Sequence, residues 1–331
     1  RTAEFLWQEG HTAHASEAEA EAFTLEILQV YRTFAEEWMA MPVITGRKTD
    51  SERFAGALRT YCIEGLMQDN KALQAGTSHN LGQNFAKAFD VNFQGADGQL
   101  AYVWNTSWGV STRLVGALVM THGDDNGVIT PPRLAQYQVV IVPIYKSDEE
   151  RELVMKAATL TLRELKAGGI RAHLDARDGL KPGAKYYEWE GRGVPFRLEV
   201  GPRDVAGGTV MLARRTGGKK MSFPTEGLGK TLRIEIDAMQ QELLDAARQR
   251  REQNTIRGIT KASFLDFLER DGGFAYGGWC GEAACENDIK EQTKATIRCL
   301  PDEEFRSPEA PVTCMWCGKP SVAEAVWARS Y

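Results

Sequence analysis

The chain has 331 residues, of which 43% are hydrophobic and 26% are charged, and its formal net charge is −5. This length suggests two or three domains, and no apolar run approaches the roughly 20 residues that a membrane-spanning helix needs. The negative total does not indicate nucleic-acid binding, although such binding depends on where cations gather and not on their sum.

The first half of the chain predicts one clear helix. Residues 17–41 follow Ser16, a plausible N-cap, and precede Pro42, which ends the helix. The apolar positions recur at helical spacing and are Phe23, Ile27, Val30, Phe34 and Trp38. We therefore expect an amphipathic helix that buries this stripe.

Three shorter segments follow this helix. Residues 74–82 are rich in Gly, Thr, Ser and His and suggest a loop or a strand edge that lines a site. Residues 102–104 predict a strand, and the apolar residues 114–120 predict a helix buried in a core.

From residue 138 the pattern changes to alternating strands and helices. Residues 138–145 form a β-branched run typical of a buried strand, and residues 148–167 form a charged amphipathic helix. Further strands are predicted at 170–175, 196–200 and 210–214. This order predicts a small α/β domain with parallel pairing. Residues 231–254 predict a long charged helix, and the pattern beyond them is irregular.

Two cysteine pairs near the end predict a metal site. Cys280 and Cys285 form one pair, and Cys314 and Cys317 form another, each beside glycine. Two short knuckles that each offer two thiolates suit a tetrahedral zinc ion, and four thiolates leave no open position for catalysis. We therefore predict a structural zinc ion. Cys299 has no such partner and Cys62 is expected in a core. Cysteines without a secretory signal predict a cytosolic protein.

Several segments resemble class II prolyl-tRNA synthetases. Thr2–His14 resembles the second half of motif 2, and Gln74–Gln83 resembles the segment that lines the ATP and proline sites. Trp108–Gly116, together with the following Thr121–Asp125, resembles motif 3. Gly193–Asp204 resembles the anticodon-binding domain. A terminal Tyr331 after a zinc domain is a mark of one subgroup, in which the terminal carboxylate is implied to fold back toward the active site.

The resemblance also implies a type and a fold. About ninety residues separate motif 2 from motif 3, too few for the bacterial editing domain, so the archaeal/eukaryote-like type is implied. The implied class is mixed α/β (α+β). It comprises a partial class II catalytic domain with an antiparallel sheet (1–130), an α/β anticodon-binding domain (136–235) and an α/β zinc-binding domain (236–331).

The implied reaction activates L-proline with ATP and Mg²⁺ and then transfers the prolyl group to tRNA(Pro). Catalysis of this kind depends on positioning and on neutralising phosphate charge. Arg113 is the implied catalytic residue and γ-phosphate partner, because a guanidinium stays charged. The other residues implied in ATP binding are Arg1, Thr2, Gln74, Thr77 and Ser111.

The same resemblance implies a proline pocket and a tRNA surface. Trp7, Glu9 and His79 would surround the compact ring and its ammonium group, and alternation places Phe5, Trp7 and Glu9 on one strand face. His11 and His14 fit no strong metal motif and are left as structural. Anticodon bases would be read by hydrogen bonds and cations, from Arg197, Glu199, Arg203 and Asp204.

The resemblance begins partway through motif 2, so motif 1, which builds the homodimer interface, is expected upstream of Arg1. We therefore expect this chain alone not to activate proline. Two alternatives remain open: a class II synthetase for histidine, threonine or glycine, and a non-catalytic tRNA-binding paralogue. The zinc tail and terminal Tyr speak against the first, and the presence of Gln74, Thr77 and Arg113 speaks against the second.

Overall fold

The computed structural model describes residues 4–331, so the predictions for Arg1 and Thr2 lie outside the described residues. The described chain divides into two compact units. Unit 1 comprises residues 4–36, 41–121 and 247–331, and unit 2 comprises residues 37–40 and 122–246. The three-domain division at 1–130, 136–235 and 236–331 stays a prediction.

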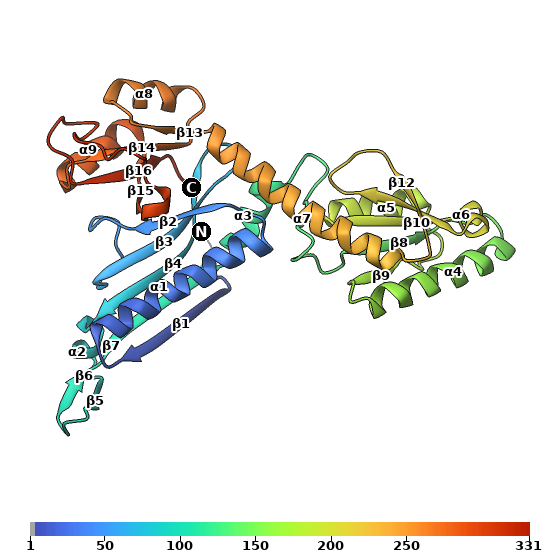
Figure 1. The fold of residues 1–331 in the computed structure, drawn as a ribbon, viewed down its shortest axis with the longest axis horizontal. Coiled ribbons are helices and arrows are strands. Elements are labelled where there is room, and N and C mark those ends of the chain that lie inside the picture. The colour runs from blue at the N-terminus through green and yellow to red at the C-terminus, as the bar shows by residue number, and fades with distance from the viewer. Residues whose placement is uncertain (1–3) are drawn as a thin grey trace. The chain divides into compact units, whose positions relative to one another are not determined.

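Unit 1 is built on a nine-stranded sheet in which the front and the tail of the chain meet (Figure 1). In sheet order the strands are β1 (Trp7–His14), β7 (Trp104–Ser111), β4 (Ala72–Gly82), β3 (Arg59–Leu66), β2 (Val43–Arg47), β15 (Thr296–Pro301), β16 (Ala323–Ala328), β14 (Phe274–Trp279) and β13 (Thr255–Arg257). Neighbours are antiparallel except β13 and β14. The segment 74–82 is therefore a central strand between β7 and β3, and the expectation of a loop or an edge was wrong.

The junction between β2 and β15 is held by close backbone approach and by buried charge. A Cβ on Gly46 would lie 2.4 Å from the carbonyl oxygen of Leu300, so only glycine fits there. Beside it, Lys48 Nζ lies 2.9 Å from Glu64 Oε1, and Arg298 Nη2 lies 3.0 Å from Glu64 Oε2. All three side chains are buried. Removing one would leave an uncompensated buried charge, so this cluster joins the tail firmly to the front of unit 1.

Helix α1 (Glu17–Thr33) continues into a π-helical turn (Phe34–Trp38) and packs on this sheet. Its N-cap is Ser16, as predicted. The predicted apolar stripe was wrong, because Val30 and Trp38 are 55% and 46% exposed. The buried face consists of Ala20, Thr24, Leu28, Tyr31 and Ala35. The Ser78 hydroxyl donates to the Thr24 carbonyl oxygen at 2.7 Å, and this close approach favours small residues over bulky ones.

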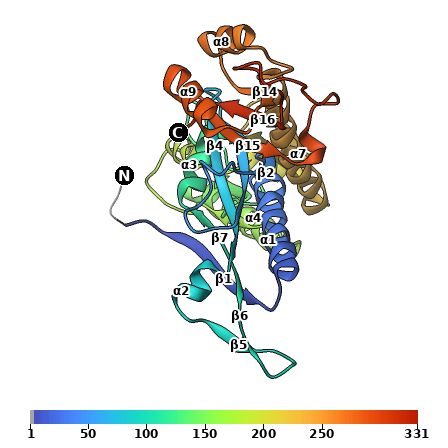
Figure 2. The same ribbon diagram turned by 90° about the vertical axis from the view of Figure 1, so that its left-hand side faces the viewer.

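The remaining elements of unit 1 lie at its periphery. They are α2 (Asn84–Ala88), β5 (Asn92–Gln94), β6 (Leu100–Tyr102), α3 (Arg113–His122), α8 (Lys261–Glu269), α9 (Ala283–Thr293) and a 3₁₀ turn (Glu303–Phe305). The β5–β6 hairpin projects from one end of the unit (Figure 2). Helix α3 buries Ala117 but exposes Val115 and Val119, so its prediction as a core helix was wrong. Most of residues 255–305 and residues 323–328 form helices and strands, although their pattern predicted irregular structure, whereas residues 306–322 contain neither.

Unit 2 is the predicted small α/β domain. Its five-stranded sheet has the order β12 (Met221–Pro224), β11 (Thr209–Arg214), β10 (Phe196–Val200), β8 (Val139–Pro143) and β9 (Ala172–Leu174). Strand β8 is parallel to both β9 and β10, as predicted. The helices are α4 (Asp148–Ala167), α5 (Pro182–Gly191), α6 (Pro202–Gly207) and α7 (Leu228–Gln253), of which residues up to 246 belong to this unit.

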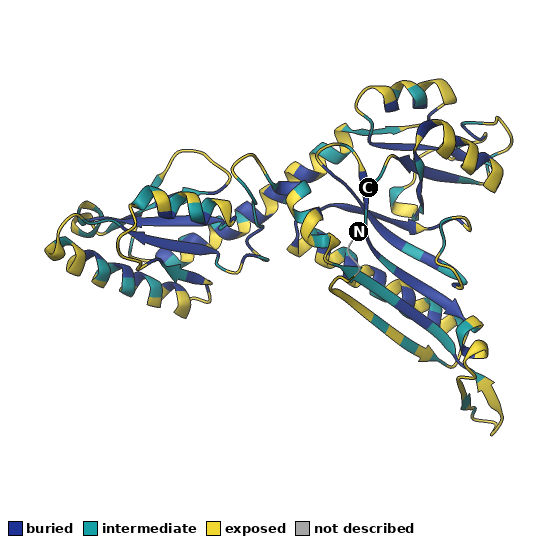
Figure 3. Ribbon diagram, turned by 180° about the vertical axis from the view of Figure 1, so that it is seen from behind, coloured by how far each residue is buried: buried dark blue, intermediate teal, exposed yellow. Residues whose placement is uncertain are grey.

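Alternation along β8 divides the core of unit 2 between two faces. Val139 and Ile141 pack in the cluster that α4 and α7 cover, and Val140 and Val142 pack with Trp189 of α5. In Figure 3 the strands are buried while the outer side of α4 is exposed. Helix α5 lies between two predicted strands and was not itself predicted; Pro182 is its first residue, where proline is well tolerated.

Candidate active site

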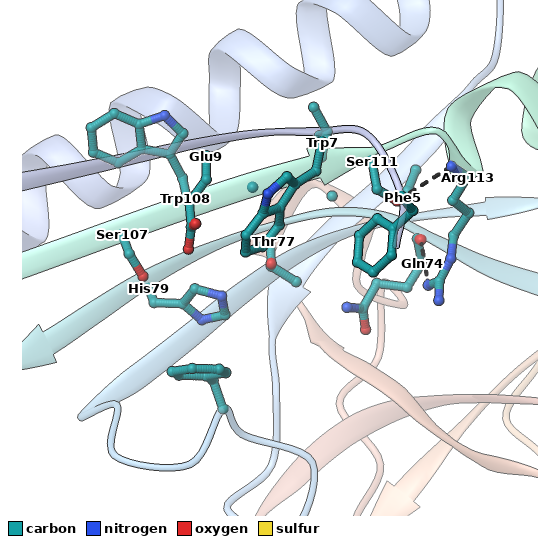
Figure 4. A pocket seen from close by; sticks show the side chains of 15 residues that line it. Phe5, Trp7, Glu9, Gln74, Thr77, His79, Ser107, Trp108, Ser111 and Arg113 are labelled. Carbon is teal, nitrogen blue, oxygen red and sulfur yellow. Dashed lines mark hydrogen bonds between the residues drawn. The ribbon is translucent and has the colours of Figure 1, made fainter. Parts of the chain in front are cut away.

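Three separated stretches of unit 1 converge on one cavity of about 340 Å³. The cavity is lined by residues of β1, β4 and β7, with the start of α3 at one end (Figure 4). The predicted residues that line it are Trp7, Glu9, Gln74, Thr77, His79, Ser111 and Arg113. The structure therefore brings together every site residue that was predicted in residues 4–113. Their contacts with ligands stay predictions.

The strand register explains why these residues meet. Glu9 and Thr77 both lie opposite Gly109 of β7, one from each side, so they form a row across three strands. Since Gly109 has no side chain, this row leaves an open floor. Trp7 lies two residues from Glu9 and points to the same face. Phe5 precedes the strand and packs edge-on against Trp7, with 5.9 Å between ring centroids.

The α3 end of the cavity carries a positive charge. The Arg113 guanidinium donates to the Gln74 carbonyl oxygen at 3.2 Å, and the Arg113 backbone N–H donates to Ser111 Oγ at 3.3 Å. Within residues 4–331, the Gln74 carbonyl oxygen is the acceptor that the guanidinium contacts, and the Arg113 side chain is exposed. Its remaining N–H groups can therefore donate to an anion in the cavity.

The opposite end is apolar and holds a neutral imidazole. His79 Nδ1 lies 3.0 Å from Thr60 Oγ1, and the Phe54 and His79 ring centroids are 4.9 Å apart. Burial lowers the pKa of His79 from 6.5 to about 4, so the ring is uncharged at neutral pH. Glu9 also lines the cavity and pairs with the exposed His11 at 3.2 Å. This end suits a compact ring with one positive group.

Phe54 and Ser107 line the cavity but lie outside the segments that the sequence pointed to. Ser107 lies in β7 directly before the motif 3 segment, so extending the strand alternation backward from Ser111 through Gly109 would have drawn attention to it. Phe54 lies in the connection between β2 and β3. A single aromatic residue in a polar loop carries no periodic signal, so nothing in the pattern pointed to it.

The chain's end lies beside β4. The Tyr331 hydroxyl donates to Asp69 Oδ2 at 2.6 Å, and the Tyr331 N–H donates to the Ala72 carbonyl oxygen at 3.3 Å. Ala72 precedes Gln74 by two residues in β4. The tail therefore folds back to the strand that lines the cavity, and the implied position of the terminal carboxylate near the site stays a prediction.

The four predicted cysteines form one cluster. All four Sγ atoms lie within 4.8 Å of one another, and Cys285 and Cys314 are 3.8 Å apart. Zinc–sulfur bonds of about 2.3 Å in a tetrahedron place sulfurs about 3.8 Å apart, so the residues fit the ion. Burial raises the pKa of the Cys314 thiol, but hydrogen bonds from the backbone N–H groups of Cys317 and Trp316 outweigh this effect and lower the pKa to about 7. The lower pKa favours the thiolate form. Gly281 and Gly318 turn the two knuckles with φ of +83° and +72°.

The predicted anticodon residues differ in their surroundings within unit 2. Arg197 and Glu199 are buried and hydrogen-bonded to each other at 3.1 Å, and Glu190 and Lys220 complete their ion pairs. Asp204 accepts the Gly201 N–H at 2.8 Å and so caps α6. Arg203 is exposed. Of the four, Arg203 is therefore the residue best placed to meet a ligand without breaking an internal contact.

The comparisons with known proteins agree with both units. Residues 138–235 match the family described as "Anticodon binding domain", and residues 262–331 match "Prolyl-tRNA synthetase, C-terminal". The chain is 52% identical to a proline–tRNA ligase of Chlorobium luteolum over all of its own length and 69% of that protein. It is also 52% identical to one of Chloroflexus aurantiacus, with 68% of that protein covered.

A solved structure supports the same assignment. It is the crystal structure of prolyl-tRNA synthetase from Cryptosporidium parvum complexed with L-proline and AMP. It shares 37% identity and a TM-score of 0.92 over the whole of this chain and 70% of its own. The mixed α/β fold predicted from the sequence is confirmed by this likeness. Together with a cavity that offers one cationic and one aromatic end, these findings show that the chain belongs to the prolyl-tRNA synthetase (proline–tRNA ligase) family.

Proposed function

We propose that the cavity activates L-proline with ATP and that the enzyme then transfers the prolyl group to tRNA(Pro). The observation that carries the proposal is the polarity of the cavity, which has Arg113 at one end and the neutral His79 with Trp7 and Phe54 at the other. A substrate with one small cationic ring and one polyanionic group matches both ends. The proline and AMP bound to the Cryptosporidium parvum relative support this match.

In the first step the proline carboxylate attacks the α-phosphate of ATP, and pyrophosphate leaves. Trp7 and His79 would enclose the pyrrolidine ring, and Glu9 would accept a hydrogen bond from its ammonium group. Gln74, Thr77 and Ser111 would contact the nucleotide while Arg113 neutralises the γ-phosphate. Such fixed donors in a partly dehydrated site favour the charge that develops on the phosphates. The nucleotide's Mg²⁺ would supply further positive charge there.

Unit 2 would bind the anticodon of tRNA(Pro). The match of residues 138–235 to an anticodon-binding family supports this role. We propose Arg203 as the directly contacting cation, with Arg197, Glu199 and Asp204 shaping the surface around it. Carboxylate and guanidinium groups can hydrogen-bond to the edges of unpaired bases.

We propose that Cys280, Cys285, Cys314 and Cys317 hold a structural zinc ion. The sulfur spacing supports a closed tetrahedral site. We expect elemental mass spectrometry to find one zinc ion per chain. The Cys285→Ser variant should lose this zinc ion and should also have a lower melting temperature. A Cys299→Ser variant is the control, because that buried thiol lies outside the cluster. Equal zinc content in both variants would contradict the proposal.

The type of synthetase, its oligomeric state and its cellular compartment are proposed from sequence similarity and from the chain's organisation. We propose an archaeal/eukaryote-like synthetase that works as a homodimer in the cytoplasm. The short stretch between the two nucleotide motifs and the C-terminal match at 262–331 support the type. Among residues 4–331, no helix combines the length and apolar composition that a membrane crossing demands.

The test is amino-acid-dependent ATP–pyrophosphate exchange by the purified full-length enzyme. Proline should support exchange, whereas histidine, threonine and glycine should not. Exchange with one of these three instead would reassign the substrate. Exchange with no amino acid, together with retained tRNA binding, would favour a non-catalytic tRNA-binding paralogue.

A further inference from the structure

The connection between β2 and β3, residues 48–57, forms one wall of the cavity. It brings Phe54 over His79, with 4.9 Å between ring centroids. The Phe54 N–H donates to Thr60 Oγ1 at 3.1 Å, and the same oxygen lies 3.0 Å from His79 Nδ1. One hydroxyl therefore links this loop to the cavity histidine on the side that faces the sheet.

The other side of this loop is held by the tail of the chain. The Thr49 hydroxyl donates to Glu286 Oε1 at 3.0 Å, and the Glu52 and Lys290 side chains pair at 3.5 Å. Glu286 and Lys290 are four residues apart in α9 and so lie on the same side of that helix. At the start of the loop, Lys48 Nζ donates to the Arg298 carbonyl oxygen at 2.5 Å. Two elements of the C-terminal tail, α9 and β15, therefore form hydrogen bonds with the start of the loop.

Glu286 is an unusual residue for its position. It is 3% exposed, and its Oε2 atom has no hydrogen-bond partner among the described residues. Thr49, also 3% exposed, supplies a hydrogen bond to the other oxygen. Burial raises the pKa of the Glu286 carboxyl, and the hydroxyl groups of Thr49 and Ser51 partly oppose that rise. Burying a carboxylate costs stability, and an apolar residue would serve the helix better. The contact with these two hydroxyl groups of the loop, of which Thr49 gives the 3.0 Å hydrogen bond, is therefore the feature that this carboxylate provides.

We propose that Glu286 is a positioning residue for the imino-acid end of the cavity, acting through Thr49 and Phe54. It fixes the start of the 48–57 loop against α9, and the fixed loop keeps the Phe54 ring over His79. This inference rests on the proposed function, since it assigns Phe54 to the wall of the proline pocket. Arg113 lies at the opposite end of the cavity from His79 (Figure 4), so loss of the contact should weaken proline binding and spare ATP.

The experiment measures proline and ATP kinetics in pyrophosphate exchange by the full-length enzyme. Thr49→Val removes the hydroxyl while keeping the side chain's shape. We expect the KM for proline to rise about fivefold or more, with the KM for ATP and kcat within about twofold, because misplacing a substrate-positioning wall weakens the interactions it makes. Thr49→Ser restores the hydroxyl and should restore the KM for proline.

A matched control comes from the same helix. Thr293 in α9 is also buried, but its hydroxyl donates to the Ile289 carbonyl oxygen and does not face the loop. Thr293→Val should change stability without changing the KM for proline. If Thr49→Val and Thr293→Val alter this KM equally, the inference is overturned. If Thr49→Val does not fold, Thr49→Ala and Glu286→Leu, which leaves the Thr49 hydroxyl without its acceptor, carry the same comparison.

A double-mutant cycle tests whether Phe54 transmits the effect. In a Phe54→Ala background, Thr49→Val should add little to the KM for proline, because the two residues act through one wall. Additive effects would overturn the proposed route. A wild-type enzyme that shows no exchange with proline would instead refute the proposed function, so the two failures are distinguishable.

Discussion

The cavity of unit 1 and the Arg197 cluster of unit 2 both contain arginine and glutamate, yet the two places use charge in opposite ways. Arg113 is exposed, and its guanidinium bonds one backbone carbonyl oxygen. Arg197 is 9% exposed, pairs with Glu190 and Glu199, and stacks on Tyr186 with 3.9 Å from its Cζ atom to the ring centroid. A charge with unused donors is prepared to bind a ligand, whereas a fully paired one stabilises its own domain.

A charged sequence motif is therefore not by itself evidence of a ligand-contact surface. Arg197, Glu199 and Asp204 carry the right chemistry for base recognition, but each is already engaged within unit 2. Their substitution would change the shape of the surface before it changed any direct contact.

Arg113→Ala should give the largest loss. We expect kcat/KM for ATP in exchange to fall by about 10²–10³-fold, because a fixed cation facing the phosphates is removed. The melting temperature should stay near that of the wild type, since the side chain is exposed. An activity loss matched by an equal loss of stability would assign Arg113 to structure instead.

Arg197→Ala should behave in the reverse way. It leaves Glu199 buried with Lys220 as its remaining cation, so unfolding of unit 2 should become easier by about 3 kcal/mol. Denaturant titration followed by unit 2 tryptophan fluorescence would measure this. Exchange with free proline should be unchanged at temperatures where the unit stays folded. A variant with normal stability and weakened tRNA binding would show that the cluster acts as a contact surface.

His79 gives a pH-dependent prediction. Its folded pKa of about 4 lies below the ordinary value of 6.5, so the unfolded chain binds its proton more readily. Stability should therefore fall as the pH drops from 6.5 toward 4, by at most about 3 kcal/mol from this residue. In His79→Gln that part of the pH dependence should disappear. Parallel curves for variant and wild type between these pH values would contradict the burial of the ring.

Arg203→Ala should give the smallest effect, and that effect should be confined to tRNA binding. The side chain is exposed, so stability should change by less than about 0.5 kcal/mol. The KM for tRNA in aminoacylation should rise about threefold to tenfold, while exchange without tRNA stays unchanged. Arg192→Ala, another exposed arginine of unit 2, is the comparison variant. Equal effects from both would indicate a general charge effect and not a specific contact.

Local patterns predicted local features well. The knuckle spacing predicted the cysteine cluster, the capped charged segment 148–167 predicted α4, and strand alternation predicted that Trp7 and Glu9 share a face. In each case the signal lies within a few residues. The choice of cavity residues in β4 and α3 needed the family resemblance, because isolated Thr, His and Arg side chains have no distinctive spacing.

Features that depend on distant contacts were missed or wrong. The buried face of α1 combines the small residues Ala20 and Thr24 with Leu28 and Tyr31, so the apolar stripe at helical spacing pointed to the wrong side. The pairing of β2 with β15 joins segments about 250 residues apart and depends on the space left by Gly46. Phe54 lies in a loop that hydrogen-bonds to α9 and to Thr60, both distant from it in sequence or on other elements. No periodicity in one chain reports such contacts.

The most direct measurement is a crystal structure of the full-length enzyme with proline and a non-hydrolysable ATP analogue. We expect the pyrrolidine ring between Trp7 and His79, with the triphosphate chain extending to the Arg113 guanidinium within hydrogen-bonding distance. Ligand density outside this cavity, or a triphosphate turned away from Arg113, would contradict the assigned reaction site.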